Sequence, residues 1–164
     1  MSKTVLILRH AKSSWSDTAL SDHDRPLKAR GERDAPRMGR LLREQGLLPD
    51  LIITSTARRA RDTADLVAQG AGYEGEVEET RTFYHAPPRA YLERLRALPP
   101  EIGRVLLVGH NPGMEELVEV LAGVTERFPT AALAHVALPI ASWDQLTPRT
   151  GGQLLHLWRP KELR

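Results

Sequence analysis

The stretch Lys3-Thr4-Val5-Leu6-Ile7-Leu8-Arg9-His10 decides the fold, because it predicts a buried strand that ends abruptly at two polar residues. Its apolar residues are continuous instead of alternating with polar ones, which is typical of a parallel strand covered on both faces. The same pattern returns from Leu48 to Ser55 and from Arg104 to His110. Helical patterns fill the intervals, from about Lys28 to Gln45, from Ala57 to Gln69 and from Pro87 to Leu98. This alternation predicts an α/β fold, a three-layer α/β/α sandwich around a mostly parallel central sheet.

Shorter signals complete the expected order of elements. Val77 to Glu79 is a candidate strand, and a helix should begin near Pro112 and end at about Leu121. Residues 131–138 and 153–158 predict an antiparallel pair at a sheet edge, because proline and glycine separate the two apolar stretches. Pro36 lies inside the first helical stretch, where its missing N–H predicts a kink or a break.

The composition is that of an ordinary globular domain. The chain has 164 residues, 41% of them apolar and 27% charged, which predicts a single domain spanning residues 1–164. The absence of cysteine excludes disulfides, thiolate nucleophiles and Cys-ligated metal sites. The sequence contains no ligand spacing such as H-E-x-x-H, so we expect neither a metal nor a cofactor.

Charge and hydropathy narrow the expected partners and compartment. The formal net charge is only +2, from 23 basic and 21 acidic residues, which is too weak a field for general polyanion affinity. The apolar run from Val5 to Leu8 is far shorter than a signal-peptide core or a membrane span. We therefore expect a cytoplasmic protein that binds neither nucleic acid nor membrane, and we expect it to be a monomer.

Polar residues follow three of the expected strands at their carboxyl ends. They are Arg9 with His10, Ser55 with Arg59, and His110 with Asn111. Ligands of such sheets bind outside the carboxyl ends of the strands, so these side chains should meet at one site. Arginine binds phosphate oxygens bidentately, and a neutral imidazole can attack phosphorus. The pattern therefore predicts phosphoryl chemistry through a phosphohistidine intermediate.

Four motifs in this order resemble the signature of the histidine phosphatase superfamily, whose fold is phosphoglycerate mutase-like. They are Arg9-His10-Ala11-Lys12, Arg25-Pro26-Leu27-x-x-x-Gly31, Ser55-x-x-x-Arg59-Ala60-x-x-Thr63 and Gly109-His110-Asn111. Within that superfamily the chain is most similar to the small SixA-type phosphohistidine phosphatases, which share the second motif. The expected order of elements resembles the family from end to end.

The resemblance implies a role for each residue that matches a motif. His10 would be the nucleophile that is transiently phosphorylated, and Arg9 and Arg59 would be the arginines that clamp the phosphoryl group. His110 would hydrogen-bond the group during transfer. Arg25 would reach it from the loop after the first strand. Substrate contacts are also expected from Ser16, which lies where phosphoglycerate mutase relatives carry an asparagine, and from Asn111.

Two departures from the family pattern bear on the chemistry. Ala11 replaces the glycine that usually follows the nucleophile, so the loop should avoid the left-handed region there. No motif identifies the Glu or Asp with which larger relatives protonate the leaving group. The candidates are Glu79, Tyr84 and His85.

The missing acid bears on the expected substrate. An alkoxide needs a positioned proton donor in order to leave, whereas the imidazole of phosphohistidine leaves readily once it is protonated. We therefore expect a phosphohistidine phosphatase acting on a phosphorylated protein. One alternative is a phosphatase of small phosphomonoester metabolites. Another, of a different class, is a phosphate-recognition module without turnover, which would lack His10 or His110.

Overall fold

The computed structural model describes residues 2–163. Its strands are β1 (Lys3–Arg9), β2 (Leu51–Ser55), β3 (Val77–Thr80), β4 (Arg104–Gly109), β5 (Leu133–Leu138) and β6 (Gln153–Trp158). Its helices are α1 (Ala29–Glu44), α2 (Arg58–Ala71), α3 (Pro88–Arg96), α4 (Gly113–Ala122) and α5 (Pro160–Leu163). Single 3-10 turns occur at η1 (Asp22–Asp24), η2 (Arg81–Phe83) and η3 (Trp143–Gln145). None of the helices in this part of the chain has both the length and the hydropathy to cross a membrane.

All the strands belong to one sheet, in the order β3-β2-β4-β1-β5-β6. The strands β3, β2, β4 and β1 are parallel to one another. Strand β5 runs antiparallel to β1, and β6 runs antiparallel to β5. The expected mostly parallel sheet with an antiparallel edge near the C-terminus is therefore confirmed. This is the α/β arrangement that the sequence predicts.

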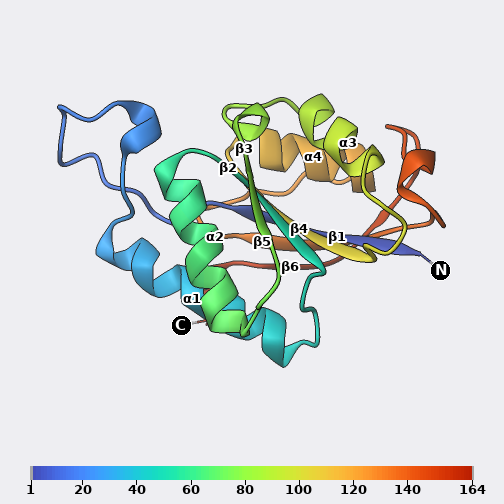
Figure 1. Ribbon diagram of the computed structural model, residues 1–164, viewed down its shortest axis with the longest axis horizontal. Helices are drawn as coiled ribbons and strands as arrows, with labels where there is room; N and C mark the ends of the chain where they lie inside the picture. Colours follow the sequence, from blue (N-terminus) through green and yellow to red (C-terminus); the bar gives the residue numbers. More distant parts are fainter. Residues whose placement is uncertain (1, 164) are drawn as a thin grey trace.

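Helices cover both faces of the sheet, with α1 and α2 on one side and α3 and α4 on the other (Figure 1). Strand β1 shows why its apolar run is continuous. Leu6 and Leu8 pack in the core under α1 and α2, whereas Val5 and Ile7 pack in the core under α3 and α4. All four side chains are completely buried. A strand with two buried faces leaves no position for a polar residue until it ends.

The expected disruption at Pro36 is partly wrong, because α1 runs without a break through this residue. Proline removes one backbone donor but fixes a φ compatible with a helix, so packing can hold the helix together. Here α1 lies tightly against α2, and a Cβ on Gly70 of α2 would overlap the Pro36 carbonyl oxygen. The close approach of the two helices stabilises α1 across the proline.

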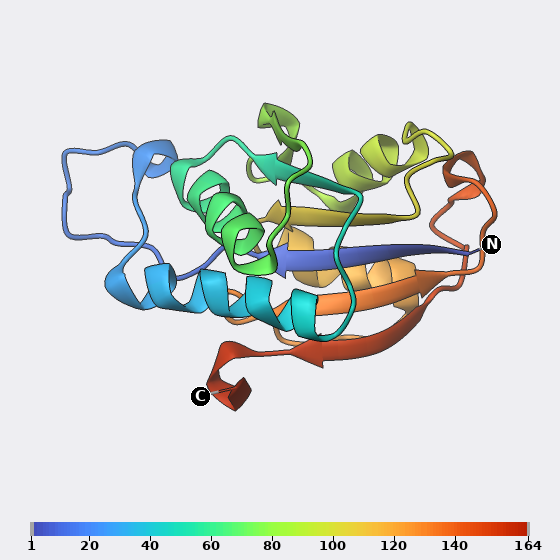
Figure 2. The ribbon, with the colours of Figure 1, turned by 60° about the horizontal axis from the view of Figure 1, so that its bottom comes forward.

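The carboxyl ends of β1, β2 and β4 point to the same side of the molecule, where a long loop after β1 stands out (Figure 2). Backbone hydrogen bonds fasten the base of this loop, from Ser14 N to the Pro26 oxygen at 2.8 Å and from Lys28 N to the Lys12 oxygen at 2.9 Å. The loop therefore returns to the sheet edge it left and contributes residues to that edge.

Candidate active site

Four polar residues from separate motifs lie together at the carboxyl edge of the sheet. Arg9 ends β1 and His10 follows it. Arg59 lies in the first turn of α2, and His110 follows β4. Because Arg9 pairs in register with Gly109, the two histidines emerge side by side, with their ring centroids 5.2 Å apart. The Nη2 of Arg59 lies 3.4 Å from Nδ1 of His110 and joins the third motif to the fourth.

The imidazole of His10 is oriented by the backbone of the next residue. Nδ1 lies 2.8 Å from the carbonyl oxygen of Ala11. A carbonyl only accepts hydrogen bonds, so Nδ1 carries the proton of the neutral ring and Nε2 keeps its lone pair. Burial lowers the pKa of His10 to about 3, and the positive charges of Arg59 and Arg9 act in the same direction. The side chain is thus a neutral imidazole with a free nucleophilic nitrogen.

The imidazole of His110 is also held by two partners. Its Nε2 lies 2.9 Å from the hydroxyl oxygen of Ser55, and its Nδ1 accepts from Arg59. Because Nδ1 accepts, Nε2 carries the proton and donates to Ser55. Burial lowers the pKa of His110 to about 2, with further lowering by His10 and Arg59. Both histidines are more than nine-tenths buried and neutral before a ligand arrives.

The two arginines have donors that no protein group uses. Within the described chain, the buried Nε of Arg9 and that of Arg59 have no hydrogen-bond partner. Arg9 is held by a bond from Nη1 to the Phe128 carbonyl oxygen at 2.9 Å. Asn111 Nδ2 donates to the same carbonyl, also at 2.9 Å. Asn111 therefore supports the segment that orients Arg9, and one of its two amide N–H donors is engaged there.

A single threonine ties the first motif to the third. Thr63 donates to the carbonyl oxygen of Arg59 at 2.6 Å and accepts from the backbone N–H of Ala11 at 2.9 Å. The four-residue interval between Arg59 and Thr63 places them one helical turn apart. Ala11 is fully buried, and the described non-glycine residues with positive φ are His85 and Ala131. The loop after the nucleophile thus avoids the left-handed region at Ala11, as the sequence predicts.

Arg25 reaches the edge of this cluster, but Ser16 does not. Arg25 is 7% exposed and donates from Nη1 to the Ser13 hydroxyl at 2.8 Å. Its guanidinium carbon lies 3.4 Å from the centre of the Trp15 ring, which is itself 66% exposed. Ser16 lies on the exposed part of the loop and bonds to the Ser14 hydroxyl at 2.8 Å.

Asp22 is the residue of this site that the sequence reasoning missed. Its Oδ1 accepts from Arg25 Nε at 3.1 Å and its Oδ2 from Arg59 Nη2 at 3.0 Å. Oδ2 also accepts from the Tyr84 hydroxyl at 2.6 Å and lies 3.2 Å from His85 Nε2. Partial burial raises the pKa of Asp22, but the bonds from Tyr84, Arg59 and Arg25 outweigh it and hold the pKa well below its usual range. The carboxylate therefore stays ionised at neutral pH.

Contact with Asp22 distinguishes two of the three candidate proton donors from the third. Tyr84 and His85 both contact Asp22, and their rings lie 5.6 and 5.4 Å from that of His110. Glu79 is an exposed residue of β3 and is not part of the cluster around Asp22. A signal for Asp22 does exist in the sequence, since it lies three residues before the Arg25-Pro26-Leu27 motif. Tyr84 and His85, which contact Asp22, come from a segment distant in the sequence, and no local pattern predicts these contacts.

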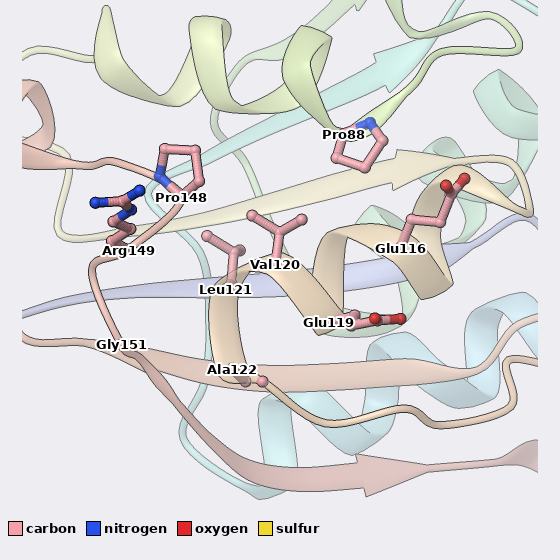
Figure 3. A pocket seen from close by; sticks show the side chains of 10 residues that line it. Pro88, Glu116, Glu119, Val120, Leu121, Ala122, Pro148, Arg149 and Gly151 are labelled. Atoms are coloured by element: carbon pink, nitrogen blue, oxygen red, sulfur yellow. The ribbon is translucent and has the colours of Figure 1, made fainter.

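Two hollows are lined by residues of α4, and the smaller one lies at this edge. A recess of about 220 Å³ opens beside His110, with His85, Asn111 and Glu116 among its lining residues. Glu116 also lines a larger groove of about 530 Å³ over α4, between Pro88 and residues 148–151 (Figure 3). The larger groove contains none of the clustered arginines and histidines. Within residues 2–163, no group of three or more His, Asp or Glu side chains could hold a metal ion.

Comparison with known proteins agrees with this geometry. A family model described as histidine phosphatase superfamily (branch 1) matches residues 5–83. An uncharacterized chloroplastic protein of Arabidopsis thaliana is 35% identical over 160 residues, covering 92% of this chain and 73% of that protein.

Among solved structures, the protein histidine phosphatase SixA in complex with tungstate superposes with a TM-score of 0.84 at 25% identity. The match covers 98% of this chain and 99% of that one. A protein of Agrobacterium tumefaciens, provisionally described as the phosphohistidine phosphatase SixA, gives 0.82 at 29% identity, covering 98% and 99% of the two chains. The chain belongs to the histidine phosphatase superfamily. Within it the chain is of the SixA type, and this likeness supports phosphatase activity.

Proposed function

We propose that the protein removes the phosphoryl group from phosphohistidine on a partner protein, through a phosphohistidine intermediate on His10. The observation that carries this proposal is the neutral, oriented imidazole of His10 beside arginine donors that no protein group uses. The similarity of the chain to a protein histidine phosphatase solved in complex with tungstate, an oxyanion, supports the same proposal.

In the first step, Nε2 of His10 attacks phosphorus while the bond from phosphorus to the substrate nitrogen breaks. The Nδ1 proton stays on His10, held by the Ala11 carbonyl, so the phosphorylated ring becomes an imidazolium. Arg9 and Arg59 face the phosphoryl oxygens and stabilise the charge of the transition state. Arg25 is the third cation of the site.

His110 takes part through a change of protonation. In the free site its Nδ1 accepts from Arg59, so it has no proton to offer an anion there. When Arg59 turns to the phosphoryl group, the adjacent negative charge raises the pKa of His110 and Nδ1 can take a proton. His110 then donates a hydrogen bond to a phosphoryl oxygen.

In the second step, water attacks phosphorus and the bond to His10 breaks. The electron pair returns to Nε2, and His10 leaves as the neutral imidazole with which the cycle began. Both protons of the water remain on the product, which departs as dihydrogen phosphate. Neither step requires a proton to be delivered to the leaving nitrogen, which is consistent with a site without a protonated carboxylic acid.

Release of inorganic phosphate tests this function. The substrates are a phosphohistidine-bearing protein and p-nitrophenyl phosphate, without added metal, for the wild type, His10→Ala and the control His156→Ala. His156 is exposed on β6 and stacks on Trp158, away from the cluster. We expect turnover by the wild type and His156→Ala, an acid-labile phosphoenzyme, and loss of both in His10→Ala.

Other results would redirect the assignment. Full activity of His10→Ala would remove the nucleophile from the proposal. Efficient turnover of sugar or nucleotide phosphates with none of phosphohistidine would favour a metabolite phosphatase. Tight phosphate binding without any turnover would favour the recognition module.

A further inference from the structure

The carboxylate of Asp22 lies at the entrance of the site and is open to a ligand. Its side chain is 36% exposed, whereas the side chains of the arginines it contacts, Arg25 and Arg59, are only 8% and 2% exposed. Tyr84 completes its contacts from another part of the chain. The exposed side of this carboxylate is thus the side on which the leaving group of a substrate could contact it.

An imidazole of the protein already lies against this carboxylate. His85 is 56% exposed, and its Nε2 is 3.2 Å from Oδ2 of Asp22. Its ring lies on that of Tyr84, with centroids 4.1 Å apart. The backbone of His85 has a φ of 52°, in the left-handed region that side chains other than glycine rarely adopt. The position beside Asp22 and Tyr84 therefore accepts an imidazole that comes from the solvent side.

The nucleophile lies deeper in the site than this carboxylate, since His10 is 7% exposed and the side chain of Asp22 is 36% exposed. His110 lies 5.2 Å from His10 between ring centroids, and 5.4 Å from His85. No direct ring contact joins His10 to His85 or to Tyr84 in the described residues. A group that leaves phosphorus on the solvent side, opposite buried His10, would therefore pass the partly exposed carboxylate of Asp22.

We propose that Asp22 determines specificity for N-phosphoryl substrates by accepting a hydrogen bond from the unphosphorylated ring nitrogen of the substrate imidazole. The inference rests on the proposed function, because it assigns the leaving group of that reaction to a place in this site. The substrate imidazole takes the position that His85 occupies in the free enzyme.

The chemistry is symmetrical with that of His10. A phosphorylated imidazole leaves as a neutral ring only when its other nitrogen carries a proton. The bond from phosphorus breaks toward the substrate nitrogen, the new bond forms to His10, and the proton on the distal nitrogen remains where it is. Asp22 holds that proton for the substrate, as the Ala11 carbonyl holds it for His10.

The same carboxylate disfavours oxygen esters. An alkoxide must gain a proton to leave, and ionised Asp22 has none to give. The charged and titratable groups around it are Arg25 on its own loop, Arg59 from α2, Tyr84 and His85 after η2, and His110 after β4. Two of these are cations, which keep the carboxylate ionised.

A ratio of two substrates tests the proposal at pH 8, where a free imidazole is mostly unprotonated. We would measure kcat/KM for a phosphohistidine peptide and for p-nitrophenyl phosphate, whose leaving group needs no proton and carries no N–H. Asp22→Asn should lower the ratio of the two values at least about ten-fold, the size expected of a charge-assisted hydrogen bond. The matched control is Asp24→Asn, which removes the same charge from a residue of η1 that contacts His23 and no arginine.

The alternatives give different results. An equal rise for both substrates would mean that Asp22 merely competes with phosphate, and an equal fall that it only supports the arginines. Either result overturns the proposal. If the wild type turns over p-nitrophenyl phosphate but no phosphohistidine peptide, the proposed function fails, whatever Asp22→Asn does.

A second variant keeps the test valid if Asp22→Asn fails to fold. His85→Ala alters an exposed side chain and empties the position beside Asp22. Compared with the wild type, we expect a lower KM for the phosphohistidine peptide. The kcat for p-nitrophenyl phosphate should be unchanged. A fall in kcat for the peptide would instead make His85 the proton donor and would overturn the inference.

Discussion

Acid should destabilise this protein well above the pH at which its carboxylates titrate, because His10 and His110 are buried as neutral rings. Burial lowers their pKa values to about 3 and about 2, whereas a histidine in the unfolded chain titrates near pH 6.5. Between these values the unfolded state binds protons that the folded state refuses. Stability therefore falls as the pH falls through 6.5.

The magnitude follows from this difference and does not depend on the depth of the shift. Each neutral buried histidine costs about 1.4 kcal/mol per pH unit below 6.5, or about 2 kcal/mol between pH 7 and pH 5. The pair should therefore lower the free energy of unfolding by about 4 kcal/mol. Asp22 and Glu78 have lowered pKa values, so their contributions to the free energy of unfolding are lost mainly below about pH 4.5. The loss between pH 7 and pH 5 is therefore due mainly to histidine.

Urea unfolding followed by circular dichroism at pH 7 and pH 5 measures the loss directly. His10→Asn should lose about 2 kcal/mol less than the wild type over this interval, whatever its stability at pH 7. The exposed His156→Asn should behave as the wild type. The reasoning is refuted if the wild type loses less than about 1 kcal/mol, or if His10→Asn loses as much as the wild type.

Three further outcomes are expected. Thr63→Val leaves the buried Ala11 N–H without its acceptor and should cost about 1–3 kcal/mol of unfolding free energy, together with a fall in kcat, because the bond to Arg59 is lost as well. Gly31→Ala would place a Cβ over the Lys12 carbonyl oxygen, so thermal unfolding should show a loss of about 1–3 kcal/mol, whereas Gly103→Ala, whose Cβ would meet only the Asp50 carboxylate at 3.4 Å, should not show this loss. Excess EDTA should leave p-nitrophenyl phosphate turnover unchanged, because arginines and histidines supply the charge of the site; a loss restored by a divalent ion would contradict this.

The sequence by itself determined the sheet and one edge of it. The continuous apolar run of β1 predicts a strand with two buried faces, and the structure buries Val5 to Leu8 completely. Parallel strands place their carboxyl ends at one edge of the sheet, so the sequence could place His10 and His110 at the same edge, and the pairing of β1 with β4 then puts them side by side. Local patterns suffice here, because strand direction and burial are properties of a few neighbouring residues.

Tertiary structure decided what those patterns do not encode. Pro36 predicts a break by local geometry, yet the packing of α1 on α2 carries the helix through it. Asp22 and Tyr84 are 62 positions apart, and only the folded loop brings their side chains within 2.6 Å. The neutral state of His10 likewise follows mainly from burial, and Arg59 and Arg25 of other segments act in the same direction as its neighbour Arg9. A contact between distant segments depends on how the whole chain packs, whereas a buried strand such as β1 is already indicated by its own continuous run of apolar residues.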